Sequence, residues 1–438
     1  MTLHARMFGA ALAVTLAEVS VSGQQPRQVD DAMLMKPADG DWITYGRDQA
    51  ETHHSPLKQI DQSNVARLAP AWSVEVGSDG KIETTPLVFD GVLYGTSTWS
   101  QVYAVDLRSG KLKWKWDPGL VRAGYEADGP RACCGPVNRG VALYKGRVYI
   151  GLLDGRLVAL NAQTGLPEWA VQTTPAGSDY TITGAPRVAR GKVLIGNSGA
   201  ELGVRGYATA YDVNTGQQLW RFYTVPGDPK NGFENAAMEM AAKTWHGEWW
   251  KQGGGGTVWD SIVYDPDLKL VYLGVGNGGP WVQAYRSPGG GDNLYLVSIL
   301  ALNAKTGKKV WHFQTTHHDI WDFDPPTAPI LADITADEIK IDRSFITDIH
   351  KRPRSQGILK AIESLSEALG MTVIAEGIET FEELAYLQTM TRIRYAQGYY
   401  FSKPIFDFLI EPARSMGYKV SVFDIFEFFF VTVKLMYD

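Results

Sequence analysis

The sequence predicts a mainly β protein, in which an incomplete β-propeller is followed by a shorter α/β segment. A motif, A-x-[DN]-x-x-[ST]-G-x-x-x-W, recurs four times, and its tryptophans lie 55, 51 and 91 residues apart. A period of about 50 residues with strand–turn–strand patterning is typical of propeller blades with four short strands. All 14 tryptophans lie before residue 322, and only five of the 46 glycines follow residue 334, so two parts of different composition meet there. The motif tryptophans are Trp114, Trp169, Trp220 and Trp311.

Each position of the repeat has a structural reason. Alanine lets neighbouring strands pack closely, and the Asx, Ser/Thr and Gly positions favour a tight turn. Tryptophan on the return strand can cover the neighbouring unit. At this period the first part of the chain supplies about five blades. The gap between Trp220 and Trp311 leaves room for one unit without the motif, plus an insertion.

Residues 335–404 have a different pattern. A short strand at 340–342 precedes an apolar helical stripe that begins near Ser355 and stops at Gly370, and a buried strand follows at 372–375. Thr380 with Glu383 predicts a capping box that opens a second helix, and 398–401 is a candidate third strand. Strand–helix–strand–helix–strand order is typical of the end of a (β/α)₈ barrel. Residues 405–438 form an unassigned tail.

Composition limits the partners and the compartment. The formal net charge of −6 gives no reason to expect nucleic acid as a partner, and no stretch after the N-terminus is long and apolar enough to span a bilayer. Residues 1–23 have the positive, apolar and small-residue order of a signal peptide, although Glu18 interrupts it. Export to the periplasm is expected, with the propeller at 24–334; the alternative is a disordered or helical N-terminus.

The run SGAELGVRGY (198–207) resembles the pyrroloquinoline quinone (PQQ) dependent alcohol dehydrogenases. The resemblance implies an eight-bladed PQQ-type propeller that contains calcium and oxidises primary alcohols to aldehydes. It also implies a small alcohol as substrate and a cytochrome c-type or quinone electron acceptor. On this resemblance, Ser198, Gly199 and Ala200 contact PQQ, and Glu201 is a calcium ligand.

The two cysteines, Cys133 and Cys134, are adjacent. Their Cα atoms are about 3.8 Å apart across a trans peptide, so a bridge between them would be strained. From this chemistry alone, two free buried thiols are the simpler interpretation. The resemblance instead implies a vicinal disulfide that packs on one face of PQQ, because the run CCGPVNRG fits the family.

Alcohol oxidation by a quinone needs a base, a Lewis acid and a holder for the flat cofactor. By resemblance, Asp319 in HHDIWDFD is the base and a metal ligand, and Asn277 joins Glu201 at the calcium, since hard cations prefer oxygen donors. Trp259 would stack on the second face of PQQ. The simpler alternatives are a solvated loop acid for Asp319, a left-handed turn residue for Asn277 and a blade-packing residue for Trp259.

Polar contacts to the cofactor are also expected from the resemblance. Arg139 could grip a PQQ carboxylate with two parallel hydrogen bonds. Glu83, Thr183 and Ser198 match further polar contacts around the ring. The sequence contains no C-x-x-C-H motif, which would attach a haem.

A second resemblance covers the α/β segment. The runs EIKIDRSFI, VIAEGIET and QGYYFSKP resemble the last third of an EAL domain, the TIM-barrel-like cyclic-di-GMP phosphodiesterase fold. Lys340, Glu376 and Gln397 match its active-site positions, but the family's EAL strand, asparagine and Asp-Asp pair are absent. We therefore do not expect hydrolysis from this segment. The alternatives to a working dehydrogenase are a degenerate EAL signalling module and a non-functional fusion product.

Overall fold

The computed structural model divides the chain into two compact units, Met1–Ala332 and Asp333–Asp438. The predicted signal peptide, both cysteines and Gln397 lie outside the residues that the structure describes. The described residues are 27–78, 80–120, 122, 135–175, 178–260, 262–324, 338–369, 372–396, 398, 400, 420–422 and 431–434.

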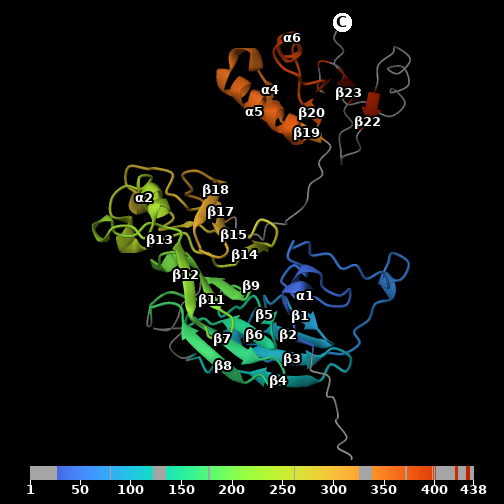
Figure 1. Ribbon diagram of the computed structural model, residues 1–438, viewed down its shortest axis with the longest axis vertical. Helices are drawn as coiled ribbons and strands as arrows, with labels where there is room; N and C mark the ends of the chain where they lie inside the picture. Colours follow the sequence, from blue (N-terminus) through green and yellow to red (C-terminus); the bar gives the residue numbers. More distant parts are fainter. Residues whose placement is uncertain are drawn as a thin grey trace, which may run out of the picture. The chain divides into compact units, whose positions relative to one another are not determined.

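Four sheets of four antiparallel strands build the first unit, each with its strands in chain order (Figure 1). This arrangement is the one expected of propeller blades. The first two sheets consist of β1 (Leu87–Phe89), β2 (Val92–Thr96), β3 (Val102–Asp106), β4 (Leu112–Trp116), β5 (Ala142–Tyr144), β6 (Arg147–Gly151), β7 (Arg156–Asn161) and β8 (Pro167–Gln172). The other two consist of β9 (Arg187–Ala189), β10 (Lys192–Gly196), β11 (Tyr207–Asp212), β12 (Gln218–Tyr223), β14 (Ile262–Asp265), β15 (Leu270–Val275), β17 (Ser298–Asn303) and β18 (Lys309–Gln314).

The sequence motif occupies the same place in every sheet. Its alanine lies two residues before the end of the third strand, opposite its tryptophan on the fourth strand, and a register shift follows each alanine. The Asx carboxylate or amide oxygen accepts backbone N–H groups of the turn, as Asp212 does from Asn214 and Thr215 at 2.9 and 3.0 Å. The predicted turn chemistry is therefore confirmed in all four copies.

Tryptophan and glycine form the joint between neighbouring sheets. The ring of Trp114 lies on the turn of the second sheet, where a Cβ on Gly165 would be 2.6 Å from it. The Trp114 indole N–H also donates to the carbonyl of Ala162 at 3.0 Å. The motif therefore fixes how successive sheets pack, because any larger residue at the glycine would displace the indole.

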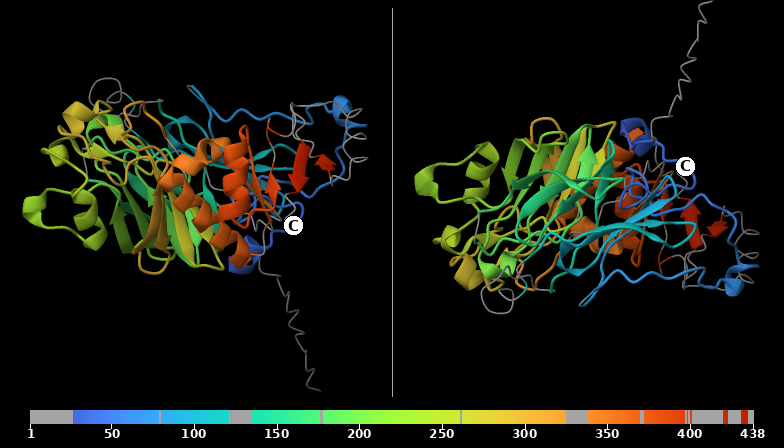
Figure 2. Two further views of the ribbon diagram at one scale, coloured as in Figure 1. Left: turned by 90° about the horizontal axis from the view of Figure 1, so that it is seen from above. Right: turned by 90° about the horizontal axis from the view of Figure 1, so that it is seen from below.

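The long gap before Trp311 is filled by an insertion, so the described residues form four blades and the expectation of about five was wrong. The insertion, which projects from the sheets in Figure 2 (green and yellow), packs around Trp245 and Trp249, whose indole N–H groups donate to the carbonyls of Leu294 and Pro226. Its elements are η4 (Pro229–Asn231), α2 (Ala236–Ala242), η5 (Trp249–Gln252), β13 (Gly254–Gly255), β16 (Gly278–Gly279) and α3 (Gln283–Arg286).

The segment before β1 contributes little regular structure. Helix α1 (Asp31–Met35) is capped by Asp30, whose carboxylate accepts the N–H of Met33, and it buries Leu34. Trp42 pairs with Val88 of β1 through an isolated bridge. Three short 3₁₀ turns complete the first unit: η1 (Val65–Arg67), η2 (Thr98–Ser100) and η3 (Ala200–Leu202).

The second unit has the predicted strand–helix–strand–helix–strand order. Parallel strands β19 (Glu338–Ile341), β20 (Thr372–Ala375) and β21 (Tyr395–Ala396) are followed in the sheet by the antiparallel pair β23 (Val431–Lys434) and β22 (Val420–Val422). Its helical elements are α4 (Arg343–Ile346), η6 (Ile349–Lys351), α5 (Pro353–Leu369) and α6 (Phe381–Met390).

Two details of that unit test the sequence predictions. The capping box of α6 is confirmed, since Thr380 Oγ1 accepts the Glu383 N–H at 3.3 Å and Glu383 Oε2 accepts the Thr380 N–H at 3.1 Å. The third strand was placed a few residues too late: it is β21, and Gly398 and Tyr400 lie in a bend and a turn. Within the described ranges, no helix combines the length and apolarity needed to cross a bilayer.

Candidate functional site

Six of the predicted site residues of the first unit line one cavity of about 350 Å³: Arg139, Thr183, Ser198, Gly199, Glu201 and Trp259. A larger hollow of about 490 Å³ lies at the rim of the first two sheets, but it includes none of them. The 350 Å³ cavity is lined by Val137, Arg139, Thr183, Ser198, Gly199, Glu201, Thr257, Trp259, Trp281, Asp322 and Asp324.

A chain of polar side chains crosses one wall of the cavity. Arg139 forms an ion pair with Glu83 at 3.0 Å and donates to Thr183 Oγ1 at 2.7 Å. The Thr183 hydroxyl lies 2.9 Å from the hydroxyl of Ser198. These residues flank strands of three neighbouring sheets: Glu83 precedes β1, Arg139 precedes β5, and Thr183 and Ser198 flank β9 and β10. The N–H of Arg139 also donates to the Thr183 carbonyl.

Trp259 provides a flat aromatic wall. The guanidinium carbon of Arg139 lies 4.6 Å from the centre of its ring, a cation–π contact. The backbone at Trp259 is held close to the preceding sheet, because a Cβ on Gly184 would be 2.4 Å from the Trp259 carbonyl oxygen. Trp259 therefore lies in the cavity wall and not at a joint between sheets.

The small residues of the 198–201 loop permit close backbone packing. Gly199 adopts φ +106°, and a Cβ there would be 2.6 Å from the Asp179 carbonyl oxygen. A Cβ on Gly279 would be 2.1 Å from the Ala200 carbonyl oxygen. This packing brings Glu201, which is exposed, beside the strand pair β13–β16.

Asp322 and Asp324 also line the cavity, and Asn277 contacts Asp324. Asn277 is 1 % exposed, and its N–H donates to Asp324 Oδ1 at 2.8 Å. Burial raises the pKa of Asp324 to about 6, and the negative charges of Asp322 and Glu201 add to that increase. Burial also raises the pKa of Asp322, again with a contribution from Glu201. Three mutually repelling carboxylates therefore lie along this wall.

The structure places Asp319 differently from the sequence prediction. Asp319 is only 4 % exposed and is not among the residues lining the cavity. Its Oδ1 accepts the N–H groups of Trp321 and Phe323, at 3.1 and 3.4 Å, so its carboxylate caps its own loop. Asp322, and not Asp319, therefore lines the cavity.

Arg286 holds the loops around these acids. It is 1 % exposed and donates to four acceptors: the carbonyls of Pro280, Trp281 and Asp319, and the side-chain oxygen of Asn293. Burial lowers its pKa to about 10. A single guanidinium thus links the turn after Asn277 to the loop that carries the aspartates.

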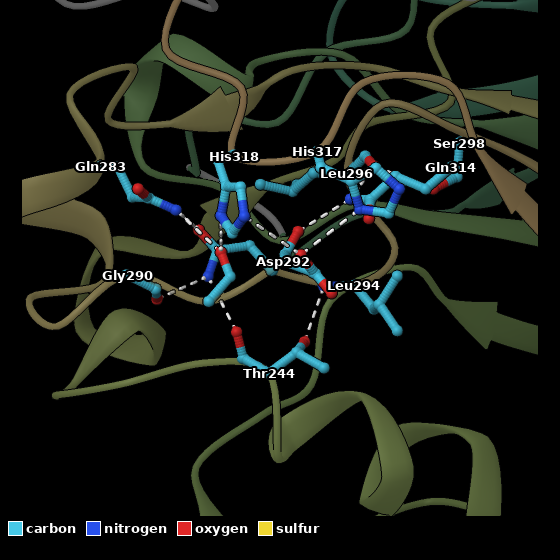
Figure 3. A network of polar contacts seen from close by, with 12 residues as sticks. Thr244, Gln283, Gly290, Asp292, Leu294, Leu296, Ser298, Gln314, His317 and His318 are labelled. Atoms are coloured by element: carbon cyan, nitrogen blue, oxygen red, sulfur yellow. Dashed lines mark hydrogen bonds and ion pairs between the residues drawn. The ribbon is translucent and has the colours of Figure 1, made fainter. Parts of the chain in front are cut away.

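Two histidines, His317 and His318, lie beside the loop that contains Asp292. His317 and His318 both point toward Asp292, at 3.3 and 3.5 Å from its Oδ1 (Figure 3). Gln314 donates to the Asp292 carbonyl at 2.7 Å. Among the residues that the structure describes, no group of three or more His, Cys, Asp or Glu side chains lies close enough to hold a metal ion.

The EAL-like residues form a separate pair in the second unit. Lys340 of β19 and Glu376, just after β20, form an ion pair at 3.1 Å. Parallel pairing of these strands brings the two side chains to the same end of the sheet. Gln397, the third predicted member, lies outside the described residues, as do Cys133 and Cys134.

Comparison with known proteins decides the family. The PQQ model described as "Glucose/ethanol/alcohol dehydrogenase, beta-propeller domain" matches residues 42–347, more than half of the chain. The chain belongs to this PQQ dehydrogenase family. The EAL domain model matches residues 324–404, which overlap the second unit of this PQQ dehydrogenase family member.

The curated relatives of this PQQ dehydrogenase family member are about twice as long as the segment of them that aligns with the chain. Quinohemoprotein alcohol dehydrogenase ADH IIB of Pseudomonas putida is 53 % identical over 312 residues, which are 70 % of this chain and 45 % of the relative. The 1-butanol dehydrogenase (cytochrome c) of Thauera butanivorans is 47 % identical over 306 residues, 68 % of this chain and 43 % of that protein. The chain thus spans less than half the length of both.

Solved structures agree with this assignment. The quinohemoprotein alcohol dehydrogenase ADHIIG of Pseudomonas putida HK5 aligns with a TM-score of 0.65 at 54 % identity, over 68 % of this chain and 44 % of that one. A europium-containing methanol dehydrogenase aligns with a TM-score of 0.60 at 37 % identity, over 67 % and 52 %. The four sheets are therefore propeller blades.

The residues present fit the family's cofactor. Arg139, Thr183 and Ser198 offer donors to an anionic ligand, and Trp259 offers an aromatic face. Glu201, Asp322 and Asp324 offer carboxylate oxygens, the donors that a hard metal ion prefers. The donor set therefore suits a flat polyanion beside a metal.

Sequence reasoning missed Asp324 and Arg286, and it preferred Asp319 to Asp322. The sequence offers one reason to consider Asp322, because an Asp side chain such as that of Asp319 often accepts the backbone N–H groups two to four residues further on and so caps its own turn. The role of Arg286 carried no local signal, because its acceptors are backbone carbonyls from other loops.

Proposed function

We propose that the first unit is the cofactor-binding part of a periplasmic PQQ- and metal-dependent dehydrogenase that oxidises primary alcohols to aldehydes. The observation that carries this proposal is the cavity whose one wall is the Arg139–Thr183–Ser198 donor chain and whose other wall holds Glu201, Asp322 and Asp324. Relatives named as alcohol dehydrogenases at about half identity support the reaction class.

Each wall has its own task in this proposal. Arg139, Thr183 and Ser198 would donate hydrogen bonds to cofactor carboxylates, and Trp259 would cover one face of the ring. The bound quinone would supply the carbonyl that accepts hydride from the alcohol carbon. Glu83 keeps Arg139 oriented through their ion pair.

We assign the substrate base to Asp322. It lines the cavity, whereas the carboxylate of Asp319 is occupied by two backbone N–H groups of its own loop. Asp322 would accept the hydroxyl proton of the alcohol as hydride leaves the adjacent carbon. Asp319 would then act indirectly, because its carboxylate fixes the conformation of the loop that carries Asp322.

A hard cation is the proposed metal, with calcium as the sequence predicts. Glu201 and the Asn277 side-chain oxygen are its proposed ligands, joined by Asp324. A relative is titled europium-containing. Because three carboxylates line this wall, a trivalent ion is worth comparing with calcium. Competition between calcium and terbium(III), whose luminescence Trp259 and Trp281 would sensitise, makes that comparison.

Electrons would leave the site to a cytochrome c-type or quinone acceptor. One relative is named for cytochrome c, which supports a soluble haem protein as acceptor. The signal-peptide pattern of residues 1–23 supports the periplasm as the compartment.

Dye-linked alcohol oxidation by the full chain, supplied with PQQ and calcium, tests the proposal. We expect turnover in the wild type, a loss of at least about a hundredfold in Asp322→Asn with PQQ still bound, and a smaller loss in Asp319→Asn. A greater loss in Asp319→Asn would return the base to Asp319. No turnover by folded, PQQ-bound protein would refute the assigned reaction for this chain.

A further inference from the structure

The same contact joins successive sheets at three places in the first unit, and a fourth copy joins the segment around Trp72 to the first sheet. In each, an indole N–H donates to the carbonyl three residues before the turn glycine of the next sheet, at 3.0 to 3.2 Å. In each, that glycine lies directly under the indole ring. The four pairs are Trp72 with Gly110, Trp114 with Gly165, Trp169 with Gly216, and Trp220 with Gly307.

Trp311 is the fifth tryptophan of the series, and the described residues of the first unit give it no such turn. It is 41 % exposed, against 9 % for Trp114 and 8 % for Trp220. Its neighbours on β18, Val310 and Phe313, are 54 % and 63 % exposed. The last sheet therefore ends in an exposed apolar strand that carries an indole N–H. Among the described residues of the first unit, no glycine turn of this repeat packs against that indole.

The first sheet has such a glycine turn, and the segment that covers it is held by fewer backbone hydrogen bonds than a paired strand. Trp72, which lies on Gly110, belongs to an extended segment (70–76) that pairs with no sheet among the described residues. Besides the indole bond to the Leu107 carbonyl, Lys115 Nζ donates to the Val76 carbonyl of this segment at 2.6 Å. A single extended segment thus covers this turn, whereas a four-stranded sheet covers each of the other three.

We propose that two copies of the chain associate head to tail, with Trp311 of each copy taking the Gly110 turn of the other in place of Trp72. In this exchange the indole of Trp311 replaces the indole of Trp72, and the incoming sheet adds Val310 and Phe313 to the contact. Since the contact is heterologous, it forms a closed ring only if the curvature of the two copies adds up to a full turn.

The curvature meets that condition. Each copy supplies four blades, and the family's propeller has eight. The chain superposes on a solved relative with a TM-score of 0.65, so its four sheets keep the relative arrangement that they have in that structure. Two copies therefore supply eight blades and leave no open sheet edge, which is the arrangement that protects edges from aggregation. This inference does not depend on the proposed reaction.

Light scattering of the full chain after size-exclusion chromatography, over a wide range of concentration, tests it. We expect a concentration-dependent dimer. Trp311→Ala should raise the dissociation constant by more than about tenfold, because buried tryptophans dominate such contacts. Trp72→Ala should lower it, because that variant removes the competing indole.

Leu166→Ala is the matched control, since Leu166 is 65 % exposed on the corresponding turn of the second sheet and should leave association unchanged. A monomer at every concentration, an open polymer, or a dimer that Trp311→Ala leaves intact would each overturn the proposal. Circular dichroism of each variant separates lost association from lost folding.

Discussion

Single buried charged residues set the geometry of the candidate site. Arg286 makes four hydrogen bonds through one guanidinium, three of them to carbonyls of loops that carry or flank the acids. Its effect on Asp322 and Asp324 is indirect, so it is a positioning residue. The sequence could supply Arg139 and Thr183, because their motif is local, but it could not supply Arg286, whose partners are brought together only by the fold.

Replacing Arg286 with Lys keeps the charge but loses the planar fork that reaches several acceptors at once. We expect a loss of at least about 2 kcal/mol in the free energy of unfolding, because charge-assisted bonds are each worth about 1.5–3 kcal/mol. Urea unfolding measures this, and terbium luminescence should show weaker metal binding. Unchanged metal affinity in a destabilised variant would contradict the positioning role.

Glu51 gives a pH dependence that is separate from the site. Burial raises its pKa from 4.5 to about 6, against an opposing effect of Arg187, while Asp48 and Asp260 add to the rise. The folded state therefore holds this proton more tightly than the unfolded state does, so stability falls as pH rises from about 4.5 to about 6. The expected fall is about 2 kcal/mol.

Glu51→Gln removes this titration. Urea unfolding across pH 4 to 7 should show that the wild type loses stability relative to the variant between about pH 4.5 and about pH 6, and that the difference is flat above that range. A difference independent of pH would contradict the raised pKa of Glu51.

At the scale of elements, the turn between the third and fourth strands carries the architecture. The repeat predicted this turn and the tryptophan cover from spacing alone, because both use residues within one strand–turn–strand unit. Spacing could not separate a fifth blade from an insertion before Trp311, since that segment is held by Trp245 and Trp249 rather than by the motif. The short strand β21 was misplaced because two paired residues leave almost no pattern.

Two glycines in one sheet allow the packing of the tryptophan–glycine joint to be tested separately from the strain of a left-handed backbone. Gly216 and Gly191 both have positive φ, +70° and +74°, but a Cβ would be 2.8 Å from the Trp169 ring at Gly216 and would meet nothing within 4 Å at Gly191. Gly191→Ala should cost about 1 kcal/mol for the left-handed backbone alone. Gly216→Ala should cost about 2 kcal/mol more, because it also displaces the indole. Equal losses in chemical unfolding would argue against the joint.

For the whole molecule, the two units make separate contributions. Composition predicts a change near residue 334, and the first unit carries every described residue of the candidate dehydrogenase site. The second unit has a fold of the expected order and joins Lys340 to Glu376, but its sequence lacks the other metal-binding motifs of its family. The candidate dehydrogenase site is therefore the cavity of the first unit.

Binding of PQQ to the full chain, followed by quenching of tryptophan fluorescence with and without calcium, tests that claim most directly. We predict saturable quenching that calcium strengthens and that Arg139→Met weakens by at least about tenfold, because the variant removes the proposed carboxylate donor while keeping a long side chain. Folded protein that shows no saturable quenching, or an Arg139→Met variant that binds as the wild type does, would contradict the claim that this cavity is the cofactor site.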